Sequence, residues 1–184
     1  MQIRPANLYD VDRLTDVLTA SFYDADGWRQ LVYPFIRLGI QEDLKQRLRA
    51  NSPRYACLAA VLPSTDDATI AGTILAGTIE IAMRSPWPWQ GDRHGYISNL
   101  AVGQGFRRQG IATALLKSCE QVARQWQIGE LRLHVMEDNP AARALYREAG
   151  FSTLQVEDSP ASWLGIQARR LLLHKVIQPL PPGL

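Results

Sequence analysis

The sequence predicts an α+β fold in which helices pack on a sheet of mixed strand direction. Segments whose apolar residues recur at spacings of three and four, typical of helices, are interspersed with apolar or alternating segments typical of strands. Over 96–136 a strand, a glycine-containing turn, a helix and a second strand follow one another. This order implies a parallel strand pair with a right-handed crossover. The length of 184 residues corresponds to one domain, expected to span 1–184.

The first half of the chain is expected to contain two helices and three strands. Asn7 and Asp10 form a capping pair ahead of the first helix. The residues on the apolar face of that helix are Val11, Leu14, Leu18 and Phe22. The other elements expected are a strand at 2–5, an irregular aromatic segment at 23–36, a charged helix at about 40–50, and a hairpin of strands at 55–62 and 69–83.

The second half is expected to alternate strands with two helices. The first of these helices follows a turn and has its apolar face at Ile111, Leu115, Cys119, Val122 and Trp126. Pro140 and Gly150 mark the start and the end of the second. In order, the other elements expected are a loop at 85–94, a strand at 96–102, a turn at 103–106, a strand at 131–136, the helix at 140–149, and strands near 152–157 and 168–177.

Composition and charge exclude several classes of protein. Hydrophobic residues make up 46% and charged residues 21%, which excludes disorder and collagen-like order. The chain has 20 Lys and Arg and 18 Asp and Glu, a formal net charge of only +2, so we expect no nucleic-acid partner. The longest apolar run, 55–62, is too short for a membrane span and the N-terminus resembles no targeting segment, so we expect no membrane partner and a cytoplasmic location. Cys57 and Cys119 are expected to be buried, with neither a zinc site nor a disulfide.

The turn that opens onto a helix, within 99–113, carries the most information. Arg107 and Arg108 stand beside a helix start in which Gly110 and Ala112 leave the backbone uncovered. The free N–H groups of a helix start suit a phosphate or pyrophosphate, and the arginines add full charges. The segment has no Walker motif and no dinucleotide fingerprint. From these residues alone, an ordinary strand-to-helix turn with solvated arginines remains open.

Two linked motifs make the chain resemble the GNAT acetyltransferase superfamily. The first is R-x-x-G-x-A from Arg107, and the second is N-x-x-A-x-x-L-Y-x-x-x-G-F from Asn139 to Phe151. Both occur in order over about 95–152, the expected acetyl-CoA core. The resemblance implies an α/β/α fold with a mixed, mostly antiparallel sheet of about seven strands, a splayed parallel pair and about four helices. It also implies acetyl-CoA as co-substrate, with no metal.

The resemblance assigns residues to acetyl-CoA. The backbone groups expected to bind the pantetheine arm belong to Leu100, Ala101 and Val102. The residues expected to cradle the pyrophosphate are Arg107, Arg108, Gln109, Gly110, Ile111, Ala112 and Thr113. Asn139 is expected to hydrogen-bond the arm, to cap the helix before Pro140, or both. Tyr146 matches the family tyrosine that protonates the leaving thiolate, although an aromatic at that position is also compatible with simple core packing.

A narrower resemblance, to the Nat-E, Nat-F and ribosomal-protein types of N-terminal acetyltransferase, concerns the base. Tyr96 and His134 match a tyrosine and a histidine that together deprotonate the amine through water. The bacterial enzymes of the ribosomal-protein type usually have Glu at the position of His134. A histidine satisfied under a covering loop is the structural alternative. His94 and His174 are expected to be structural, and three scattered histidines offer no metal site.

The acceptor is expected to be the α-amino group of a protein or peptide N-terminus, attacking the thioester directly. An α-amino group has a pKa of about 7.7–8.0 and lysine about 10.4, so a histidine and tyrosine base suits N-termini better. A lysine, a polyamine or drug amine, and a non-catalytic acyl-CoA-binding module are the alternatives. The side chains expected to line the acceptor wall are Phe22, Tyr23 and Trp163, with Tyr33 and Phe35. A loop containing Trp87 and Trp89 is a further wall or a partner surface, and the chain is expected to be a monomer or homodimer.

Overall fold

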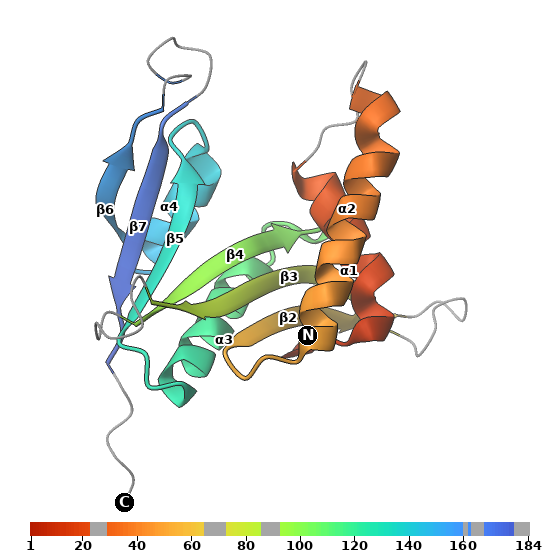
Figure 1. Cartoon of the computed structure of the whole chain (residues 1–184), viewed down its shortest axis with the longest axis horizontal. Helices are drawn as coiled ribbons and strands as arrows, with labels where there is room; N and C mark the ends of the chain where they lie inside the picture. Colours follow the sequence, from red (N-terminus) through yellow and green to blue (C-terminus); the bar gives the residue numbers. More distant parts are fainter. Residues whose placement is uncertain (23–28, 65–72, 86–92, 160–161, 163–167, 179–184) are drawn as a thin grey trace, which may run out of the picture. The chain divides into compact units, whose positions relative to one another are not determined.

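The computed structural model describes residues 1–22, 29–64, 73–85, 93–159, 162 and 168–178 (Figure 1). The α-helices are α1 (Val11–Phe22), α2 (Arg29–Ala50), α3 (Ile111–Gln125) and α4 (Pro140–Glu148), with 3-10 turns η1 (Leu8–Asp10) and η3 (Gln104–Phe106). The strands are β1 (Gln2–Pro5), β2 (Tyr55–Pro63), β3 (Thr73–Arg84), β4 (His94–Val102), β5 (Glu130–Met136), β6 (Ser152–Glu157) and β7 (Arg170–Val176). The seven strands form one sheet in the order β1-β2-β3-β4-β5-β7-β6. The mostly antiparallel sheet, with β4 parallel to β5 and four α-helices in the described residues, confirms the expected fold class.

Packing divides the chain into two compact units. The first consists of 1–80 and 99–118, and the second of 81–98 and 119–184. The boundaries fall within β3, β4 and α3, so each of these three elements contributes residues to both units.

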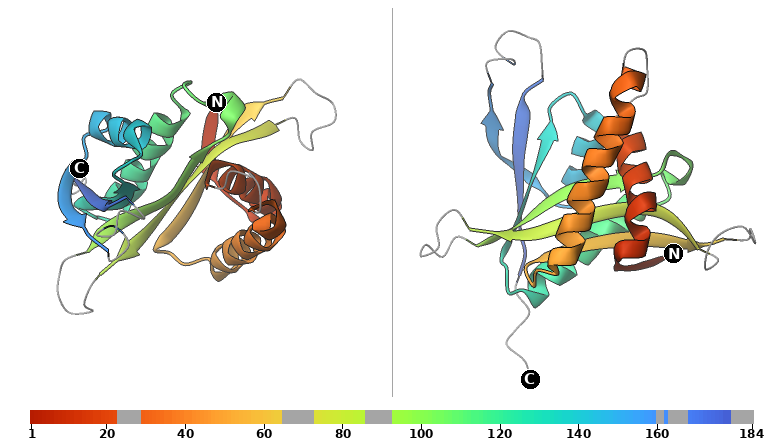
Figure 2. Two further views of the ribbon diagram at one scale, coloured as in Figure 1. Left: turned by 90° about the horizontal axis from the view of Figure 1, so that it is seen from above. Right: turned by 45° about the vertical axis from the view of Figure 1, so that its right-hand side comes forward.

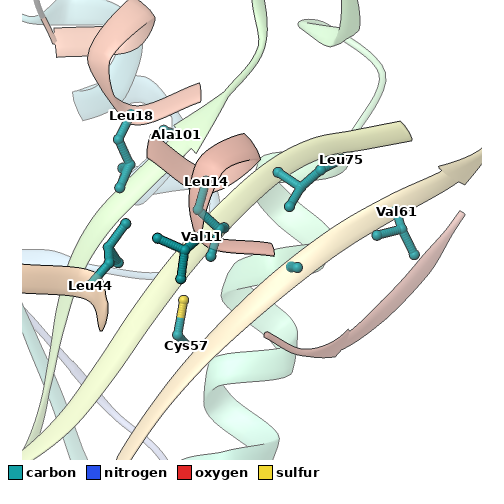
Figure 3. Close-up of a cluster of buried hydrophobic side chains, with 9 residues drawn as sticks. Val11, Leu14, Leu18, Leu44, Cys57, Val61, Leu75 and Ala101 are labelled. Atoms are coloured by element: carbon teal, nitrogen blue, oxygen red, sulfur yellow. The ribbon is translucent and has the colours of Figure 1, made fainter. Parts of the chain in front are cut away.

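The first unit is built around a cluster of apolar side chains. In this unit α1 and α2 lie side by side (Figure 2). Leu14 of α1 and Leu44 of α2 are completely buried, and each contributes about 1.5–3 kcal/mol through burial. The buried members of the cluster are Val11, Leu14, Leu18, Leu44, Cys57, Ala59, Val61, Leu75 and Ala101 (Figure 3). The helical spacing of the first three is therefore what directs α1 onto the sheet.

The capping pair expected at the start of α1 is present. The Oδ1 atom of Asn7 accepts from the backbone N–H of Tyr9 at 2.9 Å, and Asp10 accepts from the N–H of Asn7 at 2.8 Å. The two oxygens of Asp10 also accept from the guanidinium of Arg4 at 2.7 and 2.8 Å. Asp10 thus ties β1 to the start of the helical pair, and it is almost fully buried.

The second helix begins earlier than the sequence indicates. The expected irregular segment at 23–36 is wrong over 29–36, because α2 starts at Arg29; residues 23–28 lie outside the described part of the chain. Pro34 is accommodated inside the helix near its N-terminal end. Arg37 donates two hydrogen bonds to Asp16 of α1, at 3.0 and 2.9 Å. Packing of α2 on α1 therefore overrides the local loop signal of proline and aromatic residues.

In the second unit, β7 lies between β5 and β6 and is antiparallel to both (Figure 1). The pairing of β4 with β5 joins Gly95 to Leu131 and Tyr96 to Arg132. A Cβ atom on Gly95 would lie 2.8 Å from a methyl carbon of Leu131, so a larger residue there would require the Leu131 side chain to shift. In β5, Leu131, Leu133 and Val135 are buried while the residues between them are half-buried, which confirms the expected alternation.

Two further findings concern membranes and metals. None of the described helices combines the length and the apolar character needed to cross a bilayer. Within the same described part of the chain, no group of three histidine, cysteine or acidic side chains is arranged to hold a metal ion. Both cysteines are buried and neither forms a disulfide within the described residues, and burial raises the pKa of the Cys57 thiol to about 12. Cys57 is therefore protonated at neutral pH and unsuited to act as a nucleophile.

Candidate active site

The structure brings Tyr96 and His134 into direct contact. The hydroxyl oxygen of Tyr96, on β4, lies 2.7 Å from Nδ1 of His134, on β5. Tyr96 is paired with Arg132 across the two parallel strands, and His134 lies two residues further along the same face. Leu133 and Val135 point into the core instead, which leaves the imidazole half-buried on the opposite face of the sheet. The parallel strand pair therefore brings together the two residues that the sequence resemblance assigns to the base.

A carboxylate that the sequence reasoning missed completes the hydrogen bonding of His134. Oε1 of Glu157, at the end of β6, lies 3.0 Å from Nε2 of His134. Its other oxygen accepts from Arg170 of β7, at 2.9 Å from Nε and 2.8 Å from a terminal nitrogen. In the sequence Glu157 is only one of several scattered acidic residues, because the order β5-β7-β6 that brings it to His134 is not visible there.

The hydrogen bonds assign the tautomer of His134. Hydrogen bonds from His134 and from Arg170 hold the pKa of Glu157 below its usual range, so at neutral pH it is a carboxylate that can only accept. Nε2 of His134 must then carry the proton, and Nδ1 of the neutral ring is left to accept from the Tyr96 hydroxyl. His134 therefore presents its basic nitrogen to Tyr96.

The guanidinium of Arg84 packs over the ring face of Tyr96. Its guanidinium carbon lies 3.8 Å from the centre of the Tyr96 ring, a cation–π arrangement. The Tyr96 and His134 rings are tilted by 52° with their centres 5.7 Å apart, so the two rings do not stack. Tyr96 is thus held by its ring face and by its hydroxyl, which leaves little freedom to the phenol.

The helix α4 holds the second motif. Oδ1 of Asn139 accepts from the N–H of Ala142 at 3.0 Å, so Asn139 caps the helix before Pro140. Tyr146 is buried and meets Phe151 edge-on, with ring centres 5.9 Å apart. Burial raises the pKa of Tyr146 to about 12. The phenol therefore stays protonated at neutral pH and can donate a proton, and the core packing that the sequence left as an alternative also occurs.

The turn between β4 and α3 has the features of an anion site. Gly110 has a positive φ of +77°, and Arg108, two residues earlier, also has a positive φ, 63°. The carbonyl of Gly110 accepts from the N–H of Ala114 at 3.0 Å, which makes Gly110 the N-cap, but it has no side chain to cap the first helical turn. The first-turn N–H groups belong to Ile111, Ala112 and Thr113. Free donors, open space at Gly110 and exposed arginines fit a pyrophosphate.

Side chains in this turn also stabilise the loop itself. Nε of Arg107 donates to the carbonyl of Val102 at 3.3 Å, and the Gln109 amide donates to the carbonyl of Gly105 at 3.3 Å. The exposed side chain of Arg108 has no such hydrogen bond to the loop in the described part of the chain. Of the two arginines, Arg108 is therefore the freer to meet an anion.

The end of β4 is shaped by a left-handed residue. Asn99 has φ 53°, and its side-chain amide donates to the buried carboxylate of Glu80 at 2.9 Å. The next residues, Leu100, Ala101 and Val102, carry the backbone groups expected for the pantetheine arm. A Cβ atom on Gly77 would lie 2.9 Å from the Ala101 carbonyl, so β3 and β4 approach closely here. The β4–β5 ladder ends at Tyr96 and Arg132, in agreement with a splayed parallel pair.

The residues expected to line the acceptor wall are mostly beyond what the structure describes. Tyr23 and Trp163 lie outside the described residues, as do Trp87 and Trp89. Phe22 is the last residue of α1, and its side chain is also outside the described part. The acceptor wall therefore stays a prediction.

Comparison with known proteins identifies the family. Residues 18–151 match the model of the acetyltransferase (GNAT) family. A chloroplastic GCN5-related N-acetyltransferase 10 of Arabidopsis thaliana is 30% identical over 151 residues, which are 78% of this chain and 58% of the relative. The chain thus spans a little over half the length of that relative.

Two solved structures share the fold. A ribosomal-protein-alanine N-acetyltransferase from Brucella melitensis has a TM-score of 0.67 at 18% identity, covering 96% of this chain and all of that one. A PaiA N-acetyltransferase from Thermoplasma acidophilum in complex with coenzyme A has a TM-score of 0.69 at 21% identity, covering 96% and 98% of the two chains. At these identities the two solved structures show only a shared fold, whereas the match to the family model shows the family. The chain belongs to the acetyltransferase (GNAT) family.

Proposed function

We propose that this chain is an acetyl-CoA-dependent N-acetyltransferase whose preferred acceptor is the α-amino group of a protein or peptide N-terminus. The hydrogen bond of 2.7 Å between the Tyr96 hydroxyl and Nδ1 of His134 carries the proposal. It joins a proton donor and acceptor on the strand pair where the family resemblance expects the base. The family match and the coenzyme A complex of a fold neighbour support acetyl-CoA as the acetyl donor.

The reaction requires one proton to leave the amine before attack. A protonated amine passes this proton, directly or through water, to the Tyr96 oxygen while the Tyr96 proton moves to Nδ1 of His134. The neutral nitrogen then forms a bond to the thioester carbonyl carbon, and the carbon–sulfur bond breaks. Tyr146, protonated because burial raises its pKa to about 12, supplies a proton to the departing thiolate. The second proton of the amine nitrogen is released as the amide forms, so Tyr146 is reprotonated over the cycle.

The choice of an α-amine over lysine follows from the energy of that first proton transfer. The two amines differ by about 2.5 pKa units, or about 3.4 kcal/mol of deprotonation free energy at neutral pH. A neutral imidazole is a moderate base, so it removes the proton of an α-ammonium much more readily. The Brucella fold neighbour is named as a ribosomal-protein-alanine N-acetyltransferase, which is compatible with this choice.

Acetyl-CoA is proposed to use the turn before α3 and the cap of α4. The first-turn N–H groups after Gly110, with Arg107 and Arg108, would hold the pyrophosphate. The edge of β4 from Leu100 to Val102 would bind the pantetheine arm, and Asn139 would reach the same arm besides capping α4. A cytoplasmic location is part of this proposal, and the Arabidopsis relative is named as chloroplastic.

The test is acetyl transfer to peptides that offer both kinds of amine. Each peptide has a free N-terminus and one internal lysine, and matched controls have a blocked N-terminus or arginine in place of lysine. The proposal expects the acetyl group on the α-amine, located by fragment mass spectrometry, and no product when the N-terminus is blocked. Modification of lysine alone, or of no peptide despite acetyl-CoA binding, contradicts the proposed acceptor. If no peptide is modified although acetyl-CoA binds, the acceptor is a small amine or the chain is a binding module.

A further inference from the structure

We propose that Glu157 is a positioning residue for acetyl transfer, which fixes the tautomer of His134 so that Nδ1 accepts the proton arriving through Tyr96. This inference rests on the proposed function, because it assumes that Tyr96 and His134 act as the base. Glu157 does not touch the acceptor or the thioester in this scheme; it acts through His134.

The sheet builds this arrangement from three strands. His134 of β5 is paired with Leu172 of β7, and Arg170 of β7 is paired with Glu157 of β6. The carboxylate reaches back across β7 so that one oxygen meets Nε2 of His134 at 3.0 Å and the other meets Arg170. All four groups of the chain Tyr96–His134–Glu157–Arg170 belong to the second compact unit.

Both carboxylate oxygens are in use, and each has a separate consequence. The oxygen that faces His134 can only accept, so the ring proton stays on Nε2 and Nδ1 stays available. The oxygen that faces Arg170 keeps the carboxyl group ionised. When Nδ1 takes a proton, the imidazolium that forms is adjacent to a negative charge, which favours that step. The same logic governs the aspartate of a serine-protease triad, which orients a histidine and stabilises its charged form.

The sheet also contains a second histidine–glutamate pair that serves as a control. Nδ1 of His174 lies 3.1 Å from Oε1 of Glu130, and Glu130 also accepts from Arg132 at 3.1 and 2.8 Å. Glu130 and His174 are on β5 and β7, like the members of the proposed relay. The hydrogen bonds described for Glu130 join it to His174 and Arg132, so a substitution at Glu130 changes a similar ion pair without removing the carboxylate that faces His134.

The decisive substitution is Glu157→Gln. The new side chain has one oxygen, and Arg170, which can only donate, competes for it. The amide nitrogen then faces Nε2 of His134 and donates to it, which moves the ring proton to Nδ1 and removes the acceptor that faces Tyr96. We expect kcat to fall by about 10²- to 10⁴-fold, the range of general acid–base contributions, with the acetyl-CoA dissociation constant unchanged. Glu157→Asp retains the charge and is expected to recover part of the loss, whereas Glu130→Gln stays near wild type.

A second measurement does not depend on turnover. Long-range ¹H–¹⁵N spectra of protein labelled at histidine distinguish the two neutral tautomers, and a His134→Ala spectrum assigns the signals. We expect His134 with the proton on Nε2 in the wild type and in Glu130→Gln, and on Nδ1 in Glu157→Gln. Circular dichroism checks that each variant is folded, which is expected because most of β6 is exposed.

The outcomes separate the two proposals. An active wild type with an equally active Glu157→Gln variant, or a His134 tautomer that is the same in both, contradicts the role of Glu157. A wild type that acetylates no α-amine contradicts the proposed function, and the tautomer spectra then still decide whether Glu157 orients His134. Equal losses in Glu157→Gln and Glu130→Gln would show a general effect on the sheet and would also overturn the inference.

Discussion

The most quantitative expectation concerns Gly110, the N-cap residue that immediately precedes α3. Its φ of +77° lies in the left-handed region, which costs an ordinary L-residue about 1–2 kcal/mol. A Cβ atom there would meet nothing within 4 Å, so Gly110→Ala introduces backbone strain without a clash. This strain must lower the stability of the folded chain if the turn keeps its shape. If the turn relaxes, the cost appears instead in the binding of acetyl-CoA, whose pyrophosphate is proposed to bind the native turn.

The matched control is Gly105→Ala. Gly105 lies in the same turn, also has open space at its Cβ position, and is not left-handed. Both substitutions remove a glycine from the unfolded chain, an effect of about 0.4–1 kcal/mol that cancels between them. The difference between the two variants therefore isolates the strain of about 1–2 kcal/mol. In the limit where all of it appears in binding, the dissociation constant rises about 5- to 30-fold.

The assays are calorimetric titration with acetyl-CoA and urea unfolding of both variants. We expect the losses of stability and of binding free energy in Gly110→Ala, relative to Gly105→Ala, to sum to at least about 1 kcal/mol. If Gly110→Ala equals its control in both measurements, the left-handed conformation at the start of α3 is not required and the reasoning is refuted.

Two further predictions concern Tyr146 and Asp10. Tyr146→Phe is expected to lower kcat by about 10²- to 10⁴-fold without changing acetyl-CoA affinity. Burial raises the pKa of Tyr146 to about 12, so the wild-type rate should not decline near pH 10, where an ordinary tyrosine ionises. A decline near pH 10 in the pH–rate profile would contradict the role of Tyr146 as the acid. Burial opposes ionisation of Asp10, but hydrogen bonds from Arg4 and from the N–H of Asn7 hold its pKa in the folded chain below the ordinary value. The ionised carboxylate therefore stabilises the fold fully above the ordinary pKa. This stabilisation is lost as the pH falls through the lowered pKa of the folded chain. Asp10→Asn is therefore expected to lose about 1.5–3 kcal/mol in neutral urea unfolding and to converge with the wild type in acid; an equal difference at both pH values would contradict this.

Much of the fold could be predicted because the local patterns agree with the packing. The apolar spacing of Val11, Leu14 and Leu18 gives α1, and the alternation from Leu131 to Val135 gives β5. The start of α2 could not be predicted, because Pro34 and its aromatic neighbours resemble a loop and the helix is stabilised by its contact with α1.

The part of the candidate site that lies on the two parallel strands could be predicted from the sequence. Tyr96 and His134 lie on parallel strands that the sequence already places together, and they meet at 2.7 Å. The contact of Glu157 with His134 could not be predicted, because it depends on β7 lying between β5 and β6, and no local sequence pattern indicates that strand order. The acceptor wall depends on segments around Tyr23 and Trp163, which lie outside the described residues. Substrate preference is therefore the part of the function that rests least on geometry.

In the proposed mechanism Tyr96 and His134 act as one proton-accepting unit, and a double-mutant cycle measures the coupling between them. Initial rates with the best peptide are measured for Tyr96→Phe, His134→Ala and the double variant at about pH 8, where the α-amine is partly neutral. Calorimetry with acetyl-CoA checks that binding is intact in each. We expect each single substitution to lower kcat by about 10²-fold or more, and the double variant to be hardly slower than either single variant. Losses that multiply, or single variants as fast as the wild type, would contradict this mechanism.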